Sequence, residues 1–388
     1  MYYNEMAGER VSALGMGNMR LPTIGGDPNA KIDWEKAQEI IDYAYAHGIN
    51  YYDTAFRYHG GESETFIGEA LKKYPRDTWF LADKFPGHMM KRKGNGVLEF
   101  TAALTGIPDS TVPEVFEGQL RKCQVDYFDF YLLHNMNEGS YDLYTDEDLG
   151  VVKYLQEQKA LGKIRHLGFS SHGHAEVIDQ FLTKYEGVFE FVQIQLNYLD
   201  WKLQDAAKKV EVIAKHGLKV VVMEGIRGGR LAALPAEQMA KLTALRPEDS
   251  AARWALRFLQ SVPEVGVTLS GMTAIEQIID NVATYENANP VNDEERAVLA
   301  SVADSMLSWV PCTACRYCTE GCPMELEIPS IIARYNEKKN GGTVNTFGDG
   351  NTYNEALDPA RCIGCGACAA ICPQSIQIPD IMSEFAAM

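Results

Sequence analysis

The chain has 388 residues and a formal net charge of −17, with 46% hydrophobic and 23% charged residues. This length suits one large domain with a small second one, and the composition is that of a globular protein. The acidic balance argues against nucleic acid and anionic membranes as partners, and no apolar run is long enough to span a bilayer. The first residues also lack the pattern of a secretory signal, so we expect a cytoplasmic protein.

Before Trp309, short β-branched or aromatic runs alternate with segments of helical periodicity. Helical segments 34–47 and 202–216 each stop at a glycine, Gly48 and Gly217. The runs predict strands over residues 13–19, 49–53, 78–85, 127–134, 164–171, 191–198, 219–226 and 265–271. Eight strands each followed by a helix predict a (β/α)8 TIM barrel. A doubly wound sheet is the alternative, but no G-x-G-x-x-G follows the first strand.

Polar residues of catalytic type gather where these strands end. In a (β/α)8 barrel, chemistry collects at the carboxyl ends of the strands, so their placement indicates an active site. Five of them close a strand or lie near its end, namely Asp53, Lys84, His134, Ser170 and Ser171. Two more, Gln193 and Asn197, lie in the sixth predicted strand.

One segment identifies the chemistry further. Residues 52–64 read Y-D-T-A-F-R-Y-H-G-G-E-S-E, and over about residues 10 to 300 the chain resembles the aldo-keto reductases, which carry D-T-A-x-x-Y followed by G-x-S-E. The resemblance implies interconversion of a carbonyl (aldehyde or ketone) and an alcohol with NAD(P)(H). It also implies a catalytic tetrad of Asp53, Tyr58, Lys84 and His134.

The tetrad residue types fit the reaction. A carbonyl that accepts hydride becomes an alkoxide, and Tyr58 would protonate its oxygen. An unperturbed phenol, with a pKa of about 10, is a slow donor at neutral pH. Lys84 would favour the phenolate, Asp53 would hold Lys84 charged, and His134 would orient the carbonyl.

The same resemblance implies a set of cofactor contacts. Met223 stands where many members stack an aromatic on the nicotinamide, and no arginine lies near Gln277 to bind a 2′-phosphate. The choice between NADH and NADPH is therefore open, and a flavin (FMN or FAD) is the alternative cofactor. The implied contacts are Gly17, Asn18, Met19, Asp53, Ser170, Ser171, Gln193, Met223, Ser270, Gly271, Met272, Gln277, Asp280 and Asn281.

Three further features of this part allow two interpretations each. Residues 88–109 form more than a plain loop after the strand of Lys84, either a substrate lid or a solvated insertion. His172 and His174 lie near the predicted rim, where they contact substrate or else face solvent or cap a helix. Cys123 sits in a helix that Thr111 begins with a capping box, and we expect a small buried residue there rather than a reactive thiol.

Eight of the nine cysteines follow residue 311. They form two C-x2-C-x2-C-x3-C-P runs, the ligand pattern of bacterial ferredoxins, which predicts two [4Fe-4S] clusters. Zinc ribbons instead use two separated C-x2-C pairs. Resemblance to two-cluster ferredoxins implies that each run gives its fourth cysteine to the other cluster. One cluster then takes Cys312, Cys315, Cys318 and Cys372, and the other takes Cys362, Cys365, Cys368 and Cys322.

We thus expect a barrel over residues 1–290, a linking helix over 291–308 and a ferredoxin-like domain over 309–388. The favoured function is an oxidoreductase whose clusters exchange electrons with a ferredoxin-like partner while a small carbonyl or alcohol reacts in the barrel. The alternatives are a flavin-linked enzyme driven through the clusters without nicotinamide, and a non-catalytic redox-sensing or regulatory subunit.

Overall fold

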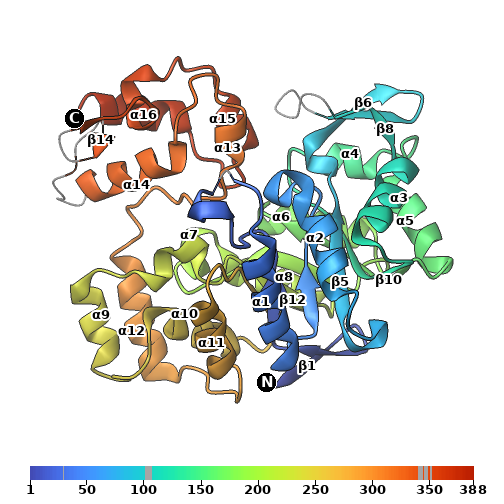
Figure 1. Ribbon diagram of the computed structural model, residues 1–388, viewed down its shortest axis with the longest axis horizontal. Coiled ribbons are helices and arrows are strands. Elements are labelled where there is room, and N and C mark those ends of the chain that lie inside the picture. The colour runs from blue at the N-terminus through green and yellow to red at the C-terminus, as the bar shows by residue number, and fades with distance from the viewer. Residues whose placement is uncertain (29, 101–106, 340–343, 345–347, 350–351) are drawn as a thin grey trace. The chain divides into compact units, whose positions relative to one another are not determined.

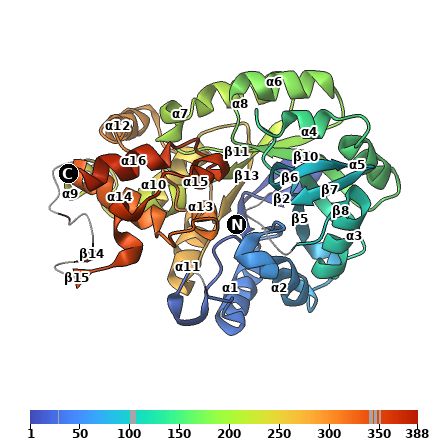
Figure 2. The ribbon, with the colours of Figure 1, turned by 90° about the horizontal axis from the view of Figure 1, so that it is seen from above.

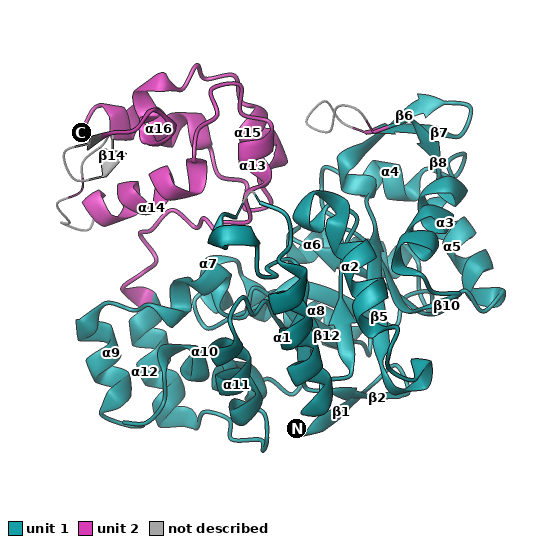
Figure 3. Ribbon diagram, viewed as in Figure 1, with its two compact units in different colours: residues 1–99, 108–303 teal, residues 100–107, 304–388 magenta. Residues whose placement is uncertain are grey.

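The computed structural model describes residues 1–28, 30–100, 107–339, 344, 348–349 and 352–388. The chain divides into two compact units, which Figure 3 draws in different colours. Unit 1 comprises residues 1–99 and 108–303, and unit 2 comprises residues 100–107 and 304–388. None of the described helices is long and apolar enough to cross a lipid bilayer.

Unit 1 is built on a closed barrel of eight parallel strands (Figures 1 and 2). The strands follow one another around the barrel in chain order, and the last pairs with the first. They are β3 Leu14–Gly17, β4 Tyr51–Asp53, β5 Phe80–Phe85, β9 Phe128–Leu133, β10 Ile164–Ser171, β11 Phe191–Gln195, β12 Lys219–Met223 and β13 Val265–Ser270. All eight predicted strands form, so the (β/α)8 prediction is confirmed and the doubly wound alternative is wrong.

One end of the barrel is closed by a hairpin of β1 Tyr3–Met6 and β2 Glu9–Ser12. Met6 and Val11 of this hairpin are fully buried against side chains of the barrel interior, among them Phe130 and Phe191. The Asn4 amide also donates to the Gly266 carbonyl near the start of β13, at 2.9 Å. This plug leaves the opposite end, where the strands finish, as the end that carries the site.

Helices surround the barrel (Figure 2). They are α1 Trp34–Ala46, α2 Glu62–Leu71, α3 Val112–Cys123, α4 Tyr141–Thr145, α5 Val151–Ala160, α6 Ala175–Lys184, α7 Asp200–Leu203, α8 Ala206–Lys215, α9 Ala236–Thr243, α10 Ala251–Gln260, α11 Ile275–Thr284 and α12 Asp293–Asp304. The capping box at Thr111 and Glu114 is present, and Cys123 is fully buried as expected.

Two local predictions need correction. The helix expected over residues 202–216 is two helices, because the chain turns through a left-handed conformation at Asp205, with φ of 49°. The sixth strand ends at Gln195, so Asn197 follows β11 rather than lying within it.

The long segment after β5 is folded rather than a plain loop. It contains β6 Met90–Gly94, β7 Val97–Phe100 and β8 Ser110–Thr111, which form a small sheet of three strands. Its Arg92 pairs with two carboxylates, Asp146 at 2.7 Å and Asp148 at 3.1 Å, which precede α5. Residues 101–106 of this segment lie outside the described residues.

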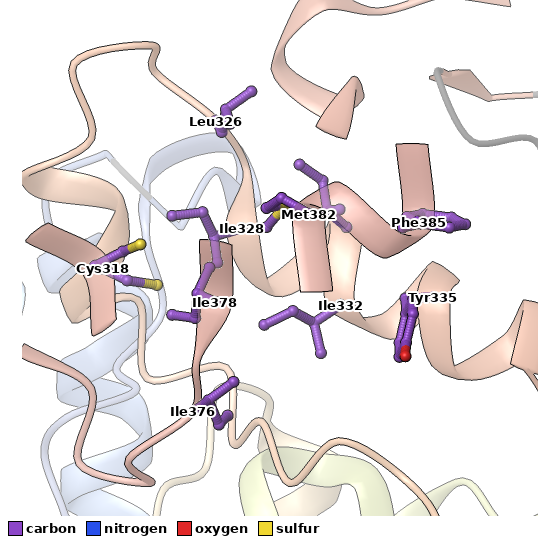
Figure 4. Packing of buried hydrophobic residues seen from close by; sticks show 11 residues of the cluster. Cys318, Leu326, Ile328, Ile332, Tyr335, Ile376, Ile378, Met382 and Phe385 are labelled. Carbon is purple, nitrogen blue, oxygen red and sulfur yellow. The ribbon is translucent and has the colours of Figure 1, made fainter. Parts of the chain in front are cut away.

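Unit 2 repeats one motif at a spacing of fifty residues. Each copy has a cysteine run with a short helix, then a longer helix that begins with isoleucine and proline. The elements are α13 Tyr317–Glu320, α14 Ile328–Lys339, β14 Gly348–Asp349, β15 Thr352–Tyr353, α15 Ala367–Ile371 and α16 Ile378–Ala386. Figure 4 shows the apolar core between the copies, where Ile328, Ile332, Ile378, Met382 and Phe385 gather.

Candidate active site and cluster sites

The four predicted tetrad residues come from neighbouring strand ends. Asp53 is the last residue of β4, Lys84 lies one residue before the end of β5, and His134 directly follows β9. Tyr58 begins a 3₁₀ helix, Tyr58–Gly61, five residues beyond Asp53. Because β4, β5 and β9 are adjacent and parallel, their carboxyl ends meet at one mouth of the barrel.

A buried ion pair anchors the site. The Lys84 Nζ donates to Asp53 Oδ1 and to the Thr54 carbonyl, each at 2.7 Å, and both charged side chains are almost completely buried. Burial raises the pKa of Asp53, and the Lys84 ammonium opposes this rise. A buried charge is tolerated when it is paired in this way, so the two residues fix each other's position.

Tyr58 and His134 lie next to this pair. The Lys84 Nζ is 5.1 Å from the centroid of the Tyr58 ring. The rings of Tyr58 and His134 are 6.3 Å apart, centroid to centroid, and nearly perpendicular at 88°. The structure therefore brings together all four residues that the sequence singled out.

His134 is a neutral imidazole in this setting. Burial is the main cause that lowers its pKa well below the usual value, and His88, Lys84 and His172 lower it further. A neutral ring can donate one hydrogen bond and accept another. It can thus bind a carbonyl oxygen without placing a charge there.

Among the predicted cofactor contacts, Gln193 has the clearest unused hydrogen-bonding capacity. Its Oε1 is buried and has no hydrogen-bond partner among the described residues, while its Nε2 lies 3.7 Å from the Met223 sulfur. By contrast, the Ser170 hydroxyl accepts from the Asn135 amide at 2.8 Å, and the Ser171 hydroxyl accepts from the Gly173 amide at 3.0 Å. A buried orphan acceptor suits an incoming amide, such as a nicotinamide carboxamide.

The ends of β3 and β13 lie side by side, which brings together the contacts predicted near residues 17–19 and 270–272. The backbone and side-chain amides of Asn18 both donate to the Asp53 carbonyl at 2.9 Å, and Asn18 Oδ1 is a second buried acceptor without a described partner. Ser270 accepts from Asn281 at 3.1 Å. Met19 is half-buried and Met272 fully buried.

Two predicted contacts on α11 are engaged elsewhere. The Gln277 oxygen accepts from the Thr273 amide at 2.8 Å, within the first turn of the helix. The Asp280 carboxylate accepts from Arg253 Nε at 2.6 Å and from Ser250 at 3.1 Å, which ties α11 to α10. These three bonds would have to open, or be shared, for the two side chains to reach a cofactor.

Sequence reasoning missed a buried polar network beyond β11 and β12. The Asp200 carboxylate accepts from Gln195 at 2.7 Å, from Asn197 at 2.6 Å and from Arg227 Nε at 3.1 Å. Arg227 has φ of 50° and Glu224 has φ of 59°, a strained conformation for residues with side chains. The network ties the start of α7 to the end of β11 and to the segment after β12.

A second missed network lies behind Lys84. Asp83 and Glu64 are completely buried together, and the Lys84 amide donates to Asp83 Oδ1 at 2.8 Å. Gln119 bonds both Glu64 and the Lys84 carbonyl, at 2.9 and 3.0 Å. Burial is the main cause that raises the pKa of Asp83 well above 3.8, and the Glu64 charge adds to it.

This raised pKa predicts a stability effect. The folded state holds the Asp83 proton more tightly than the unfolded chain, so Asp83 costs stability increasingly as pH rises above about 3.8. Asp83→Asn mimics the neutral carboxyl, so its thermal midpoint relative to wild type should rise by at least about 2 °C between pH 5 and 8. Exposed Asp77→Asn is the control. Parallel curves for Asp83→Asn and wild type would refute the assignment.

The eight cysteines of unit 2 form two groups. One hollow is lined by Cys322, Cys362, Cys365 and Cys368, so the last cysteine of the first run lies with the first three of the second. Burial raises the pKa of Cys318, and Cys315, Cys312, Cys372 and Cys368 raise it further, in that order. The first three of these neighbours make up the second group with Cys318. Thiols in two such groups of four fit two [4Fe-4S] clusters.

The comparisons with known proteins agree with this geometry. Residues 13–304 match the Aldo/keto reductase family, and residues 311–376 match the 4Fe-4S dicluster domain. The chain belongs to the aldo-keto reductase family. It is an oxidoreductase of that family with a ferredoxin-like iron–sulfur domain at its C-terminal side. The predictions of an enzyme and of both domain types are confirmed.

Its similarity to individual relatives is moderate. An NADH-specific methylglyoxal reductase of Escherichia coli is 27% identical over 76% of this chain and 96% of its own length. The L-galactose dehydrogenase of Arabidopsis thaliana is 26% identical over 71% of this chain and 85% of its own. The solved structure of an aldo-keto reductase from Bacillus halodurans, in its holo form, has a TM-score of 0.61 and 26% identity, covering 78% of this chain and 96% of its own.

Proposed function

We propose that the barrel interconverts a carbonyl compound and an alcohol with NAD(P)(H). The observation that carries this proposal is the Lys84 ammonium, bonded to Asp53 and facing the Tyr58 ring, with the His134 ring beside it. A bound nicotinamide supplies or accepts the hydride. The chain's own residues then have to hold the substrate and move one proton.

Each tetrad residue has a part in that proton transfer. His134 donates a hydrogen bond to the carbonyl oxygen, and its neutral state leaves Lys84 as the cation of the site. Tyr58 gives its hydroxyl proton to this oxygen as negative charge develops on it. The Lys84 charge stabilises the phenolate that remains, and Asp53 keeps that charge in place.

Gln193 and Asn18 support nicotinamide as the cofactor, since each keeps a buried acceptor without a described partner. The relative from Escherichia coli is named as NADH-specific, which favours NADH over NADPH here. The absence of an arginine next to Gln277 in the sequence favours the same choice. Of the predicted cofactor contacts, we assign Gly17, Asn18, Ser170, Ser171, Gln193, Met223, Ser270 and Gly271 to the bound nucleotide.

For the second domain, we propose the crosswise assignment of the clusters. Cys322 serves the cluster of Cys362, Cys365 and Cys368, and Cys372 serves the other. The clusters exchange single electrons with a ferredoxin-like partner in the cytoplasm. We also keep the division into a barrel over 1–290, a linking helix over 291–308 and the cluster domain over 309–388. The described residues offer nothing that favours a flavin over a nicotinamide.

The test is an anaerobic assay of the full chain with both clusters reconstituted. We expect oxidation of NADH, and more slowly of NADPH, that depends on an added small aldehyde and yields the alcohol. If neither nucleotide is oxidised with any carbonyl, and neither is reduced with any alcohol, the barrel chemistry is refuted. If the clusters take no electron from reduced ferredoxin, the partner proposal is refuted independently.

A further inference from the structure

Three consecutive strands of the barrel are each followed by a histidine at the mouth. His88 comes three residues after β5, His134 directly after β9, and His172 directly after β10. These strands are neighbours, in that order. The tetrad accounts for His134 alone, so the other two have no role in the proton transfer described above.

His88 is the residue whose polar atoms lack an explanation. Its ring lies against the ring of His134, with the centroids 4.4 Å apart and the planes at 64°. Both of its ring nitrogens are buried, and neither makes a hydrogen bond of good geometry with the described residues; the His134 backbone is the polar group near enough to raise the pKa of His88. Native proteins pair almost all such atoms, so an unpaired group beside a reaction site indicates a missing ligand.

The protonation states of these three histidines limit which chemical groups can bind to them. Burial is the main cause that lowers the pKa of His88 to about 4 and that of His172 to about 3. His134 is neutral for the same reason. A neutral imidazole offers one donor and one acceptor, which match a hydroxyl group. A carboxylate would find only single donors on these three rings, and the nearby Lys84 ammonium is already paired with Asp53.

We propose that His88 binds a hydroxyl group on the carbon next to the carbonyl that His134 holds. The preferred substrates are then neutral α-hydroxy carbonyl compounds, or vicinal diols in the reverse direction. The adjacency of the two rings matches the adjacency of the two oxygens in such a substrate. This inference rests on the proposed function, since the hydride goes to the same carbonyl carbon and Tyr58 protonates the same oxygen.

The test compares glycolaldehyde with acetaldehyde, which differ only by the hydroxyl group. In the wild-type holoenzyme we expect kcat/KM to be about 10- to 100-fold higher for glycolaldehyde. His88→Phe keeps a ring against His134 and should abolish this preference, mostly through KM, while acetaldehyde changes by less than about threefold. His88→Asn, with one donor and one acceptor, should retain part of it. His47→Phe, at the C-terminal cap of the outer helix α1, is the control, and it should keep the full preference.

Each result decides the inference. Equal efficiency with both aldehydes in the wild type overturns it and leaves the proposed function standing. An equal loss for both aldehydes in His88→Phe, with cluster absorbance and thermal midpoint unchanged, shows that His88 only supports His134 and also overturns it. If the wild type reduces neither aldehyde nor any other carbonyl, the inference and the proposed function fail together.

Discussion

Tyr58→Phe is expected to lower kcat/KM for carbonyl reduction by about 10²- to 10⁴-fold, the usual contribution of a positioned acid. The substitution removes only the hydroxyl group, and the ring can keep its place near Lys84 and His134. NADH binding should therefore stay within about twofold of wild type, because binding energy shared by ground state and transition state is not lost. Steady-state kinetics and a fluorescence titration with NADH measure the two quantities.

Tyr52→Phe is the matched control for this variant. Tyr52 lies in β4 next to Asp53 and is fully buried, and its hydroxyl donates to the Ile49 carbonyl at 3.1 Å. Its loss should lower stability by about 1 kcal/mol and leave kcat/KM unchanged. Equal activity losses in the two variants, or full activity in Tyr58→Phe, would show that Tyr58 is not the acid.

The barrel could be predicted from the sequence because each strand appears as a short run of apolar, β-branched or aromatic residues. Most of the strand residues are buried, so the apolar runs stand out between helical segments, as in β9, where all six residues are buried. The position of the tetrad could be predicted equally well, since the carboxyl ends of the strands in a parallel barrel all lie at one mouth. Asp53, Lys84 and His134 could be placed there without knowing any distance.

Features that depend on side-chain contacts between distant segments could not be predicted in this way. Glu64 and Gln119 are far apart in the chain, and only the packing of α2 on α3 brings them together behind Lys84. The break between α7 and α8 has no glycine or proline to mark it, and the Asp200 network anchors α7 instead. The position of His88 just after the strand of Lys84 did point to the mouth of the barrel, but nothing in the sequence distinguished it from an ordinary loop residue.

The crosswise arrangement of the cluster ligands is the prediction with the largest expected effect in unit 2. Cys322 lies ten residues after Cys312 in the sequence, yet it lines the same hollow as Cys362 and Cys368. Substituting both Cys322 and Cys362 with serine should remove ligands from one cluster only. The variant should keep about four of about eight irons per chain, with one intact [4Fe-4S] signal.

Sequential ligation gives a different result for the same variant. If each run held its own cluster, serine at positions 322 and 362 would damage both clusters, and iron content would fall toward zero. A variant with serine in place of Cys318 and Cys322 reverses the two expectations, with both clusters damaged in the crosswise case and one in the sequential case. Cys123→Ser, at a buried position of helix α3 in the barrel unit, should keep all the iron. Iron and sulfide analysis with EPR of the reduced protein thus separates the two arrangements, because two thiols taken from one cluster leave the other its full set of four.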